Sequence, residues 1–253
     1  MKYHVKLNEE MLASAKIAIL PGDPGRVEKT AKFISPKAQF LACNREYTSW
    51  LTDIEGKNIL VCSTGIGGPS LSIAVEELAG LGIKTFIRIG TTGAIQPFIK
   101  IPSLIITTGA VRLDGASKHY APVEYPAVAD FDITSALIEG AKKTGIYFYK
   151  GITASSDTFY PGQERYDTYS KYVIKDFQGS LSEWQKLHVL NFEMESATLF
   201  TIANAFGLKA GCISSVIVNR TQNEIPDDKV LAQAEQNLAS AVNYALSILT
   251  INE

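Results

Sequence analysis

The sequence is poor in the residues that bind metals or form disulfides. It has three cysteines, Cys43, Cys62 and Cys212, without CxxC spacing, and three histidines that do not cluster with them. This scatter argues against a zinc site and against a disulfide framework. Because Cys62 and Cys212 lie in apolar runs, we expect both thiols to be buried as small hydrophobic groups.

Long apolar runs and an excess of positive charge are also missing. No stretch approaches the roughly 20 apolar residues that span a bilayer, and the first residues, MKYHVK, have no signal-peptide core. The formal net charge of −2 provides no field that would favour nucleic acid or an anionic membrane. We therefore expect a cytoplasmic protein that acts on a small molecule.

What the sequence does contain is an alternation of short apolar runs and helix-like segments. The apolar runs are typical of strands buried on both faces, and they cover residues 16–20, 58–62, 85–89, 103–107, 150–154, 188–192 and 210–218. The helix-like segments cover residues 69–79, 134–143 and 230–249. This pattern predicts one α/β domain over residues 1–253, with a central mixed, mostly parallel sheet flanked by helices.

One apolar run contains an arginine. Arg88 lies in the stretch FIRIGTTGA, residues 86–94, where the apolar run gives way to small and hydroxyl residues. A charge taken out of water needs a partner, and the planar guanidinium suits a carboxylate or a phosphate. Taken alone, this pattern leaves open whether the anion is a structural Asp or Glu or a ligand.

Arginine is otherwise scarce, with six residues against eighteen lysines. Arg26, Arg88 and Arg220 lie at or just after the ends of apolar runs, and Arg165 lies in an aromatic and polar stretch, residues 155–172. Because ligands bind at the carboxyl ends of parallel strands, these positions predict an anion site that also takes a planar polar ligand. Scattered surface salt bridges are the alternative. The stretch 155–172 is typical of a binding loop.

Three shorter motifs are ambiguous. The segment PGDPGR, residues 21–26, fits a phosphate-binding corner or an ordinary turn. Residues 64–69 lack the GxGxxG spacing of a dinucleotide site. In NFEMESA, residues 191–197, two carboxylates either favour a helix start or accept hydrogen bonds from sugar hydroxyls.

Together these residues resemble the hexameric nucleoside phosphorylases, and most closely the branch of that family that acts on uridine. The resemblance covers nearly the whole chain. The matching segments are PGDPGRVEK (21–29), REYTSW (45–50), VCSTGIGGPSLSIAVEEL (61–78), RIGTTGAIQP (88–97), DGASKHYAPVEYPAVADF (114–131), SSDTFYPGQERYDTYS (155–170), NFEMESATL (191–199) and VIVNRTQNEIP (216–226).

The resemblance implies a role for each of these positions. Phosphate would be bound by Gly22, Arg26, Arg88 and Thr91, with Arg45 from a neighbouring subunit. Ribose would be bound by Met194 and Glu195, with His4 from the neighbour. The base would be bound by Gln163 and Arg165, beside Thr92, Gly93, Phe159, Phe192, Ile217 and Arg220. A potassium ion would be held by Glu46, Ser70 and the carbonyl of Ile66. Catalysis would depend mainly on Arg88, Glu195, Arg165 and Gln163.

The implied reaction converts uridine and inorganic phosphate reversibly to uracil and ribose 1-phosphate, without a redox cofactor. The resemblance also implies a homohexamer, a trimer of dimers in which two subunits share each active site. Gln163 carries a donor and an acceptor, which match the adjacent carbonyl and N–H of uracil. Arg220 stands where a purine enzyme would need an acid.

The alternatives are a purine nucleoside phosphorylase, a nucleosidase of the same fold and a non-catalytic nucleoside-binding protein. Phe192 replaces a tyrosine of the best-known relatives, and KIP at residues 100–102 replaces a glycine-containing turn.

Overall fold

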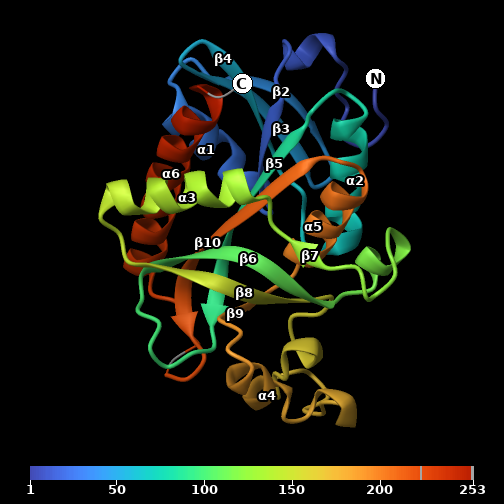
Figure 1. Ribbon diagram of the computed structural model, residues 1–253, viewed down its shortest axis with the longest axis vertical. Coiled ribbons are helices and arrows are strands. Elements are labelled where there is room, and N and C mark those ends of the chain that lie inside the picture. Colours follow the sequence, from blue (N-terminus) through green and yellow to red (C-terminus); the bar gives the residue numbers. More distant parts are fainter. Residues whose placement is uncertain (223, 252–253) are drawn as a thin grey trace.

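The computed structural model describes residues 1–222 and 224–251. Its centre is one ten-stranded mixed sheet with helices on both faces, so the predicted α/β fold with a mixed sheet is confirmed (Figure 1). The strands are β1 Ile17–Pro21, β2 Gln39–Asn44, β3 Tyr47–Ile54, β4 Lys57–Cys62, β5 Thr85–Ala94, β6 Ser103–Leu113, β7 Ala127–Val128, β8 Phe148–Ser156, β9 Asn191–Glu193 and β10 Lys209–Asn219. The α-helices are α1 Val27–Ile34, α2 Gly68–Ala79, α3 Phe131–Thr144, α4 Ser180–Lys186, α5 Ser196–Ala205 and α6 Asp228–Ile251.

The strand order places several carboxyl ends at one edge. The order is β10-β6-β8-β9-β5-β1-β4-β3-β2, and β10 also pairs with β5, which closes β5, β10, β6, β8 and β9 into a ring. Pairing is parallel from β4 through β1 and β5 to β10. The loops that follow β1, β4, β5 and β10 therefore meet at the same edge. Antiparallel pairs join β10 to β6, β9 to β5, β2 to β3, β3 to β4 and β6 to β7. Among the described residues these five pairs equal the parallel ones in number, so the expectation of a mostly parallel sheet was wrong.

Two hydrophobic clusters cover the two faces of the sheet. Leu20 and Phe86 pack with residues of α2 and α5, whereas their chain neighbours Ile19 and Ile87 pack with residues of α1, α3 and α6. Successive side chains of a strand point to opposite faces, so burial of both neighbours requires helices on both sides. Cys62 and Cys212 are fully buried, as predicted.

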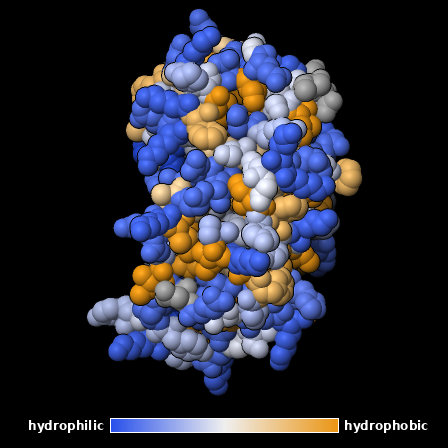
Figure 2. All heavy atoms as spheres, turned by 90° about the vertical axis from the view of Figure 1, so that its left-hand side faces the viewer, coloured by the Kyte–Doolittle hydropathy of each residue, from blue (hydrophilic) through white to orange (hydrophobic). Residues whose placement is uncertain are grey.

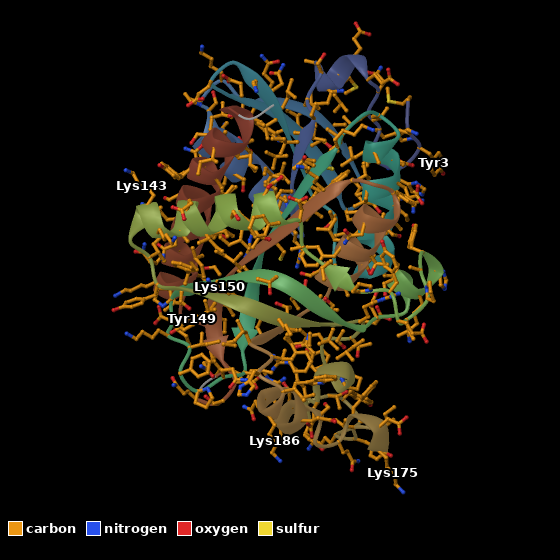
Figure 3. The ribbon with its side chains drawn as sticks, viewed as in Figure 1. Tyr3, Lys143, Tyr149, Lys150, Lys175 and Lys186 are labelled. Carbon is orange, nitrogen blue, oxygen red and sulfur yellow. The ribbon has the colours of Figure 1, made fainter. Side chains whose placement is uncertain are left out.

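The stretch after β8 leaves the body of the sheet. Residues 157–188 include α4 and short 3-10 turns at Pro161–Gln163 and Lys175–Phe177. In Figure 1 this stretch extends beyond the end of the sheet, and Figure 3 shows Lys175 and Lys186 pointing away from it. The irregular conformation that the sequence predicted for residues 155–172 is confirmed from Asp157 onward.

The surface that carries α6 is mostly hydrophilic, with its hydrophobic side chains in groups between polar ones (Figure 2). Among the described residues, none of the helices combines the length and the apolar character that crossing a bilayer requires.

Candidate active site

A cavity of about 860 Å³ opens where the carboxyl ends of β1, β5 and β10 meet. Its lining also includes the segment after β8 and the junction between β9 and α5. The predicted residues that line it are Gly22, Arg26, Glu46, Ile66, Arg88, Thr91, Thr92, Gly93, Phe159, Gln163, Arg165, Phe192, Met194, Glu195 and Ile217. Segments that are far apart in the sequence thus line one open cavity.

Arg88 is a buried residue in the lining of this cavity and pairs with two carboxylates. Its Nε lies 3.1 Å from Glu193 Oε2, and its Nη2 contacts Glu195 Oε2. Burial disfavours the charged guanidinium, but Glu195 and Glu193 outweigh it and raise the pKa of Arg88. Nη1 is buried without a hydrogen-bond partner among the described residues. Arg88, which lines the cavity, therefore has structural anions and retains one donor that no described residue uses.

Glycine at position 22 leaves room beside that donor. A Cβ added to Gly22 would lie 3.2 Å from the carbonyl oxygen of Gly65 and 3.9 Å from Arg88 Nη1. Any larger side chain at Gly22 would therefore extend into the space that Nη1 faces. Gly22 and Arg88 thus lie side by side in the lining of the cavity.

The two glutamates of the β9–α5 junction differ in their surroundings. Glu193 accepts the backbone N–H groups of Glu195 at 2.8 Å and Ser196 at 2.9 Å, so it satisfies donors at the start of α5. Glu195 Oε1 accepts the backbone N–H of Gly67 at 2.6 Å. Burial raises the pKa of Glu195, against the opposing effect of Arg88, and Glu193 adds to the rise. The helix-start interpretation thus describes Glu193, whose contact with Arg88 the sequence did not predict.

The anion-binding end of the cavity is completed by Arg26 and Thr91. Arg26 ends a 3-10 turn, Pro24–Arg26, in which Asp23 accepts the backbone N–H of Gly25 at 2.8 Å. The segment PGDPGR is therefore a turn, and that turn also places a guanidinium in the cavity. Arg26 Nε lies 3.3 Å from Glu235 Oε1 of α6.

Buried polar side chains also line the opposite end. Gln163 and Arg165 are buried, and the Arg165 guanidinium stacks on Phe159, with Cζ 4.3 Å from the ring centroid. Burial lowers the pKa of Arg165. Arg165 Nε is buried without a hydrogen-bond partner among the described residues. This end therefore offers a flat aromatic surface and polar groups in one place, as a planar polar ligand requires.

Arg220 lies behind this end, although it does not line the cavity. It donates to the carbonyl of Gln163 at 2.6 Å and packs 5.7 Å from the ring centroid of Phe192. Burial and the nearby Arg165 lower the pKa of Arg220. Glu224, which the sequence did not single out, pairs with Arg220 at 2.9 Å and contacts Arg165.

Two predicted residues lie away from the cavity, on a common surface. His4 Nδ1 lies 2.8 Å from Glu77 Oε1, and Asn44 donates to the carbonyl of His4 at 2.7 Å. Arg45 follows Asn44 in the exposed turn between β2 and β3. Neither His4 nor Arg45 lines the cavity of its own chain.

The residues expected to hold potassium are partly brought together. Ser70 Oγ lies 3.0 Å from Glu46 Oε1. Hydrogen bonding to its own backbone N–H is the main cause that lowers the pKa of Glu46, with Ser70 contributing. An ionised carboxylate beside a hydroxyl oxygen is a donor set that suits a hard cation. Ile66 is exposed beside them.

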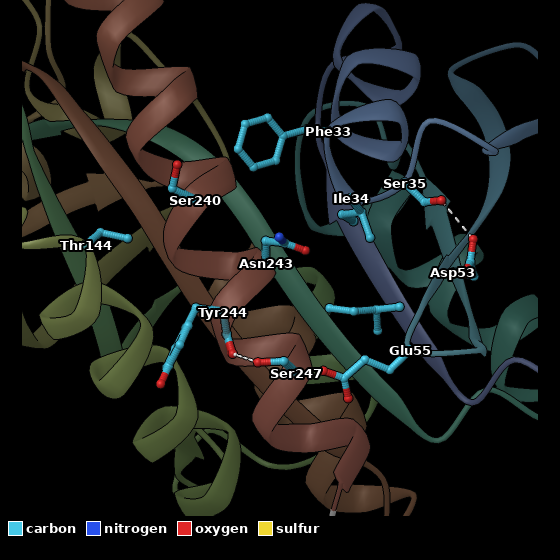
Figure 4. Close-up of a pocket in the computed structure, with 11 residues that line it drawn as sticks. Phe33, Ile34, Ser35, Asp53, Glu55, Thr144, Ser240, Asn243, Tyr244 and Ser247 are labelled. Atoms are coloured by element: carbon cyan, nitrogen blue, oxygen red, sulfur yellow. Dashed lines mark hydrogen bonds between the residues drawn. The ribbon is translucent and has the colours of Figure 1, made fainter.

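A separate cavity of about 580 Å³ lies between the end of α1, the end of β3 and the outer face of α6. Phe33, Asp53, Asn243 and Tyr244 line it, and Asp53 accepts a hydrogen bond from Ser35 at 2.8 Å (Figure 4). It contains none of the predicted site residues.

The fold and the cavity of about 860 Å³ define an α/β protein whose site suits an anion together with a planar polar ligand. The chain belongs to the phosphorylase superfamily, whose family model matches residues 16–250. It is 57% identical over 247 residues to the uridine phosphorylase of Haemophilus influenzae, covering 98% of each chain. It is 57% identical over 240 residues to that of Escherichia coli, covering 95% of this chain and 94% of the relative. A guanosine phosphorylase of Halorubrum lacusprofundi is 36% identical over 239 residues, covering 93% of each chain. The resemblance inferred from the sequence motifs is thereby confirmed.

Proposed function

We propose that this chain catalyses the reversible phosphorolysis of uridine. The observation that carries the proposal is the buried Nη1 of Arg88, which has no hydrogen-bond partner among the described residues and belongs to a side chain that lines the same cavity as Gly22, Arg26, Gln163 and Arg165. Such a cavity suits an anion and a planar polar group together. The 57% identity to uridine phosphorylases supports the choice of base.

In this proposal, phosphate is the nucleophile. Gly22, Arg26, Arg88 and Thr91 bind it, and the guanidinium groups offset its charge. Glu195 accepts hydrogen bonds from the ribose hydroxyls, beside Met194. A phosphate oxygen then forms a bond to C1′ while the bond from C1′ to N1 of the base breaks. Holding both reactants in one cavity lowers the entropic cost of their encounter.

The electron pair of the broken bond leaves with uracil, whose negative charge spreads over its two carbonyl oxygens. Arg165 and Gln163 donate hydrogen bonds to that edge and stabilise the developing charge. Phe159 and Phe192 pack on the base, Thr92, Gly93 and Ile217 complete its surroundings, and Arg220 supports them through its contacts with Gln163 and Phe192. The proton that phosphate gives up ends on N1 of uracil, so no redox cofactor enters the balance.

We further propose that the chain works as a cytoplasmic homohexamer, a trimer of dimers in which a neighbour supplies His4 and Arg45. The placement of both residues on one surface outside the cavity of their own chain supports this. A potassium ion would be held by Glu46, Ser70 and the carbonyl of Ile66 at the dimer interface. When bound there, it would offset the charge of the Glu46 carboxylates.

The test follows the ultraviolet absorbance of uridine with and without phosphate. We expect loss of uridine only with phosphate, together with equal amounts of uracil and ribose 1-phosphate. Arg88→Ala should lower kcat/KM by about 100- to 1000-fold, because a charge-stabilising donor is lost. Since Arg88→Ala also leaves Glu193 and Glu195 without their cation, its melting temperature must be measured. The more exposed Arg26 provides a second variant, Arg26→Ala, which should raise the KM for phosphate.

Three results would contradict the proposal. Loss of uridine without phosphate would indicate a nucleosidase, and faster turnover of inosine than of uridine would indicate a purine phosphorylase. Binding of uridine with no turnover in the presence of phosphate would indicate a binding protein.

A further inference from the structure

Arg26 is enclosed less tightly than Arg88. Its side chain lines the catalytic cavity and also a second cavity of about 370 Å³ between α1, β5 and α6. Thr91 lines both cavities as well. A long arginine side chain with open volume on two sides has many rotamers available, and fixing one of them costs conformational entropy. Packing alone therefore does not fix the direction of this guanidinium.

The contact that fixes it comes from α6. Glu235 Oε1 lies 3.3 Å from Arg26 Nε, and Glu235 Oε2 lies 4.0 Å from Lys29 Nζ. Glu235 lines the second cavity and does not line the catalytic one. It can therefore act on a ligand of the catalytic cavity only through the side chains that it holds.

The ion pair uses one edge of the guanidinium. Because Glu235 engages Nε, the Nη1 and Nη2 groups remain for an anion in the catalytic cavity, and a phosphate can accept from both. We propose that Glu235 is a positioning residue for phosphate, which orients Arg26 from the side opposite the substrate. This inference rests on the proposed function, because it requires Arg26 to bind phosphate.

A positioning role makes a specific kinetic prediction. Glu235→Ala should raise the KM for phosphate about tenfold, which corresponds to the loss of one charge-assisted contact. The KM for uridine and kcat should stay within about twofold, because Glu235 does not reach the base end or the reacting atoms. Glu235→Gln should raise the KM for phosphate less than Glu235→Ala does, because the amide keeps the size and polarity of the side chain and loses only its charge.

The matched control is Glu28→Ala on the neighbouring helix α1. Glu28 pairs with Lys32 at 2.6 Å, and both side chains are exposed. This change removes a carboxylate of the same type that lies close to Arg26 in the sequence but pairs with Lys32 instead, and it should leave all kinetic constants unchanged.

Each outcome separates the inference from the proposed function. An unchanged or lowered phosphate KM in Glu235→Ala overturns the inference. A parallel rise in the KM of both substrates overturns it too, because it indicates a general disturbance of the fold. A wild-type protein that consumes no uridine with phosphate contradicts the proposed function instead.

Discussion

Each of the cavity arginines, Arg26, Arg88 and Arg165, contacts a carboxylate from a distant part of the chain. Arg88 Nε and Glu193 Oε2 are separated by 105 residues in the sequence. Glu235 pairs with Arg26, and Glu224 pairs with Arg165, again from distant parts of the chain. A buried or half-buried cation needs such partners, and each pair also restricts which donor groups remain for a ligand. The carboxylates therefore set the geometry of the site as much as the arginines do.

The raised pKa of Glu195 predicts a pH dependence. Glu195 must be ionised to pair with Arg88 and to accept hydrogen bonds from ribose hydroxyls. Burial raises its pKa above the ordinary glutamate value of 4.5. As the pH falls through this raised pKa, the carboxylate gains a proton, and kcat/KM for uridine should fall about tenfold per pH unit.

Glu195→Gln provides the control for that profile. This variant should have a lower kcat/KM throughout and should lack the acid limb, because the amide does not titrate. An identical acid limb in the wild type and the variant would assign the titration to another group. Melting curves at each pH show whether the fold remains intact over the range used.

The sequence predicted those site residues whose chemical type is unusual for their position. Arg88 stands out in an apolar run, and Arg165 stands out in an irregular aromatic stretch. Glu193, Glu224 and Glu235 carry no such signal, because acidic residues near helix starts and in loops are common on any surface. Their roles follow from contacts across the tertiary structure, which spacing along the chain does not encode.

At the scale of elements, the sequence predicted the strands that consist of continuous apolar runs. It missed the strands in which apolar and polar residues alternate irregularly. The runs at residues 16–20, 58–62, 85–89 and 210–218 correspond to β1, β4, β5 and β10, which are buried on both faces. The hairpin of β2 and β3 was missed because its residues alternate irregularly between buried and exposed. The start of helix α5 was indicated by the acidic residues at 191–197, but its extent was not predicted, because eight of its ten residues are buried and leave no polar face to show a helical period.

The crossing of α3 and α6 requires glycine at position 140. A Cβ added to Gly140 would lie 2.2 Å from the carbonyl oxygen of Ala241 in α6. Alanine gains up to about 1 kcal/mol in helix propensity, but forcing backbones apart in a packed core typically costs about 1–3 kcal/mol. We expect Gly140→Ala to lower the melting temperature by several degrees, as measured by calorimetry.

The control for this substitution is Glu139→Ala, the adjacent position of α3. Glu139 is exposed and pairs with the exposed Lys142. Its replacement should change the melting temperature little. A melting temperature of Gly140→Ala at or above that of the wild type would show that the two helices can separate without cost.

At the scale of the whole molecule, one surface brings together the residues that the resemblance assigns to a neighbouring site. The hydrogen bond from Asn44 to the carbonyl of His4 joins the N-terminal segment to the turn that carries Arg45. Glu77 of α2 fixes His4 further by accepting its backbone N–H at 3.0 Å. Two basic side chains held this way could enter a second copy of the cavity across a twofold interface.

Shared sites predict that two defective subunits restore activity when they are combined. In a dimer of Arg45→Ala and Arg88→Ala subunits, one site has both arginines intact and the other has neither. Random pairing makes half of the dimers mixed, so about one quarter of all sites should be active. The measurement is phosphate-dependent loss of uridine in the co-expressed, co-purified mixture, compared with each variant alone. Activity no greater than the average of the two parents would show that Arg45 does not act in a neighbour's site.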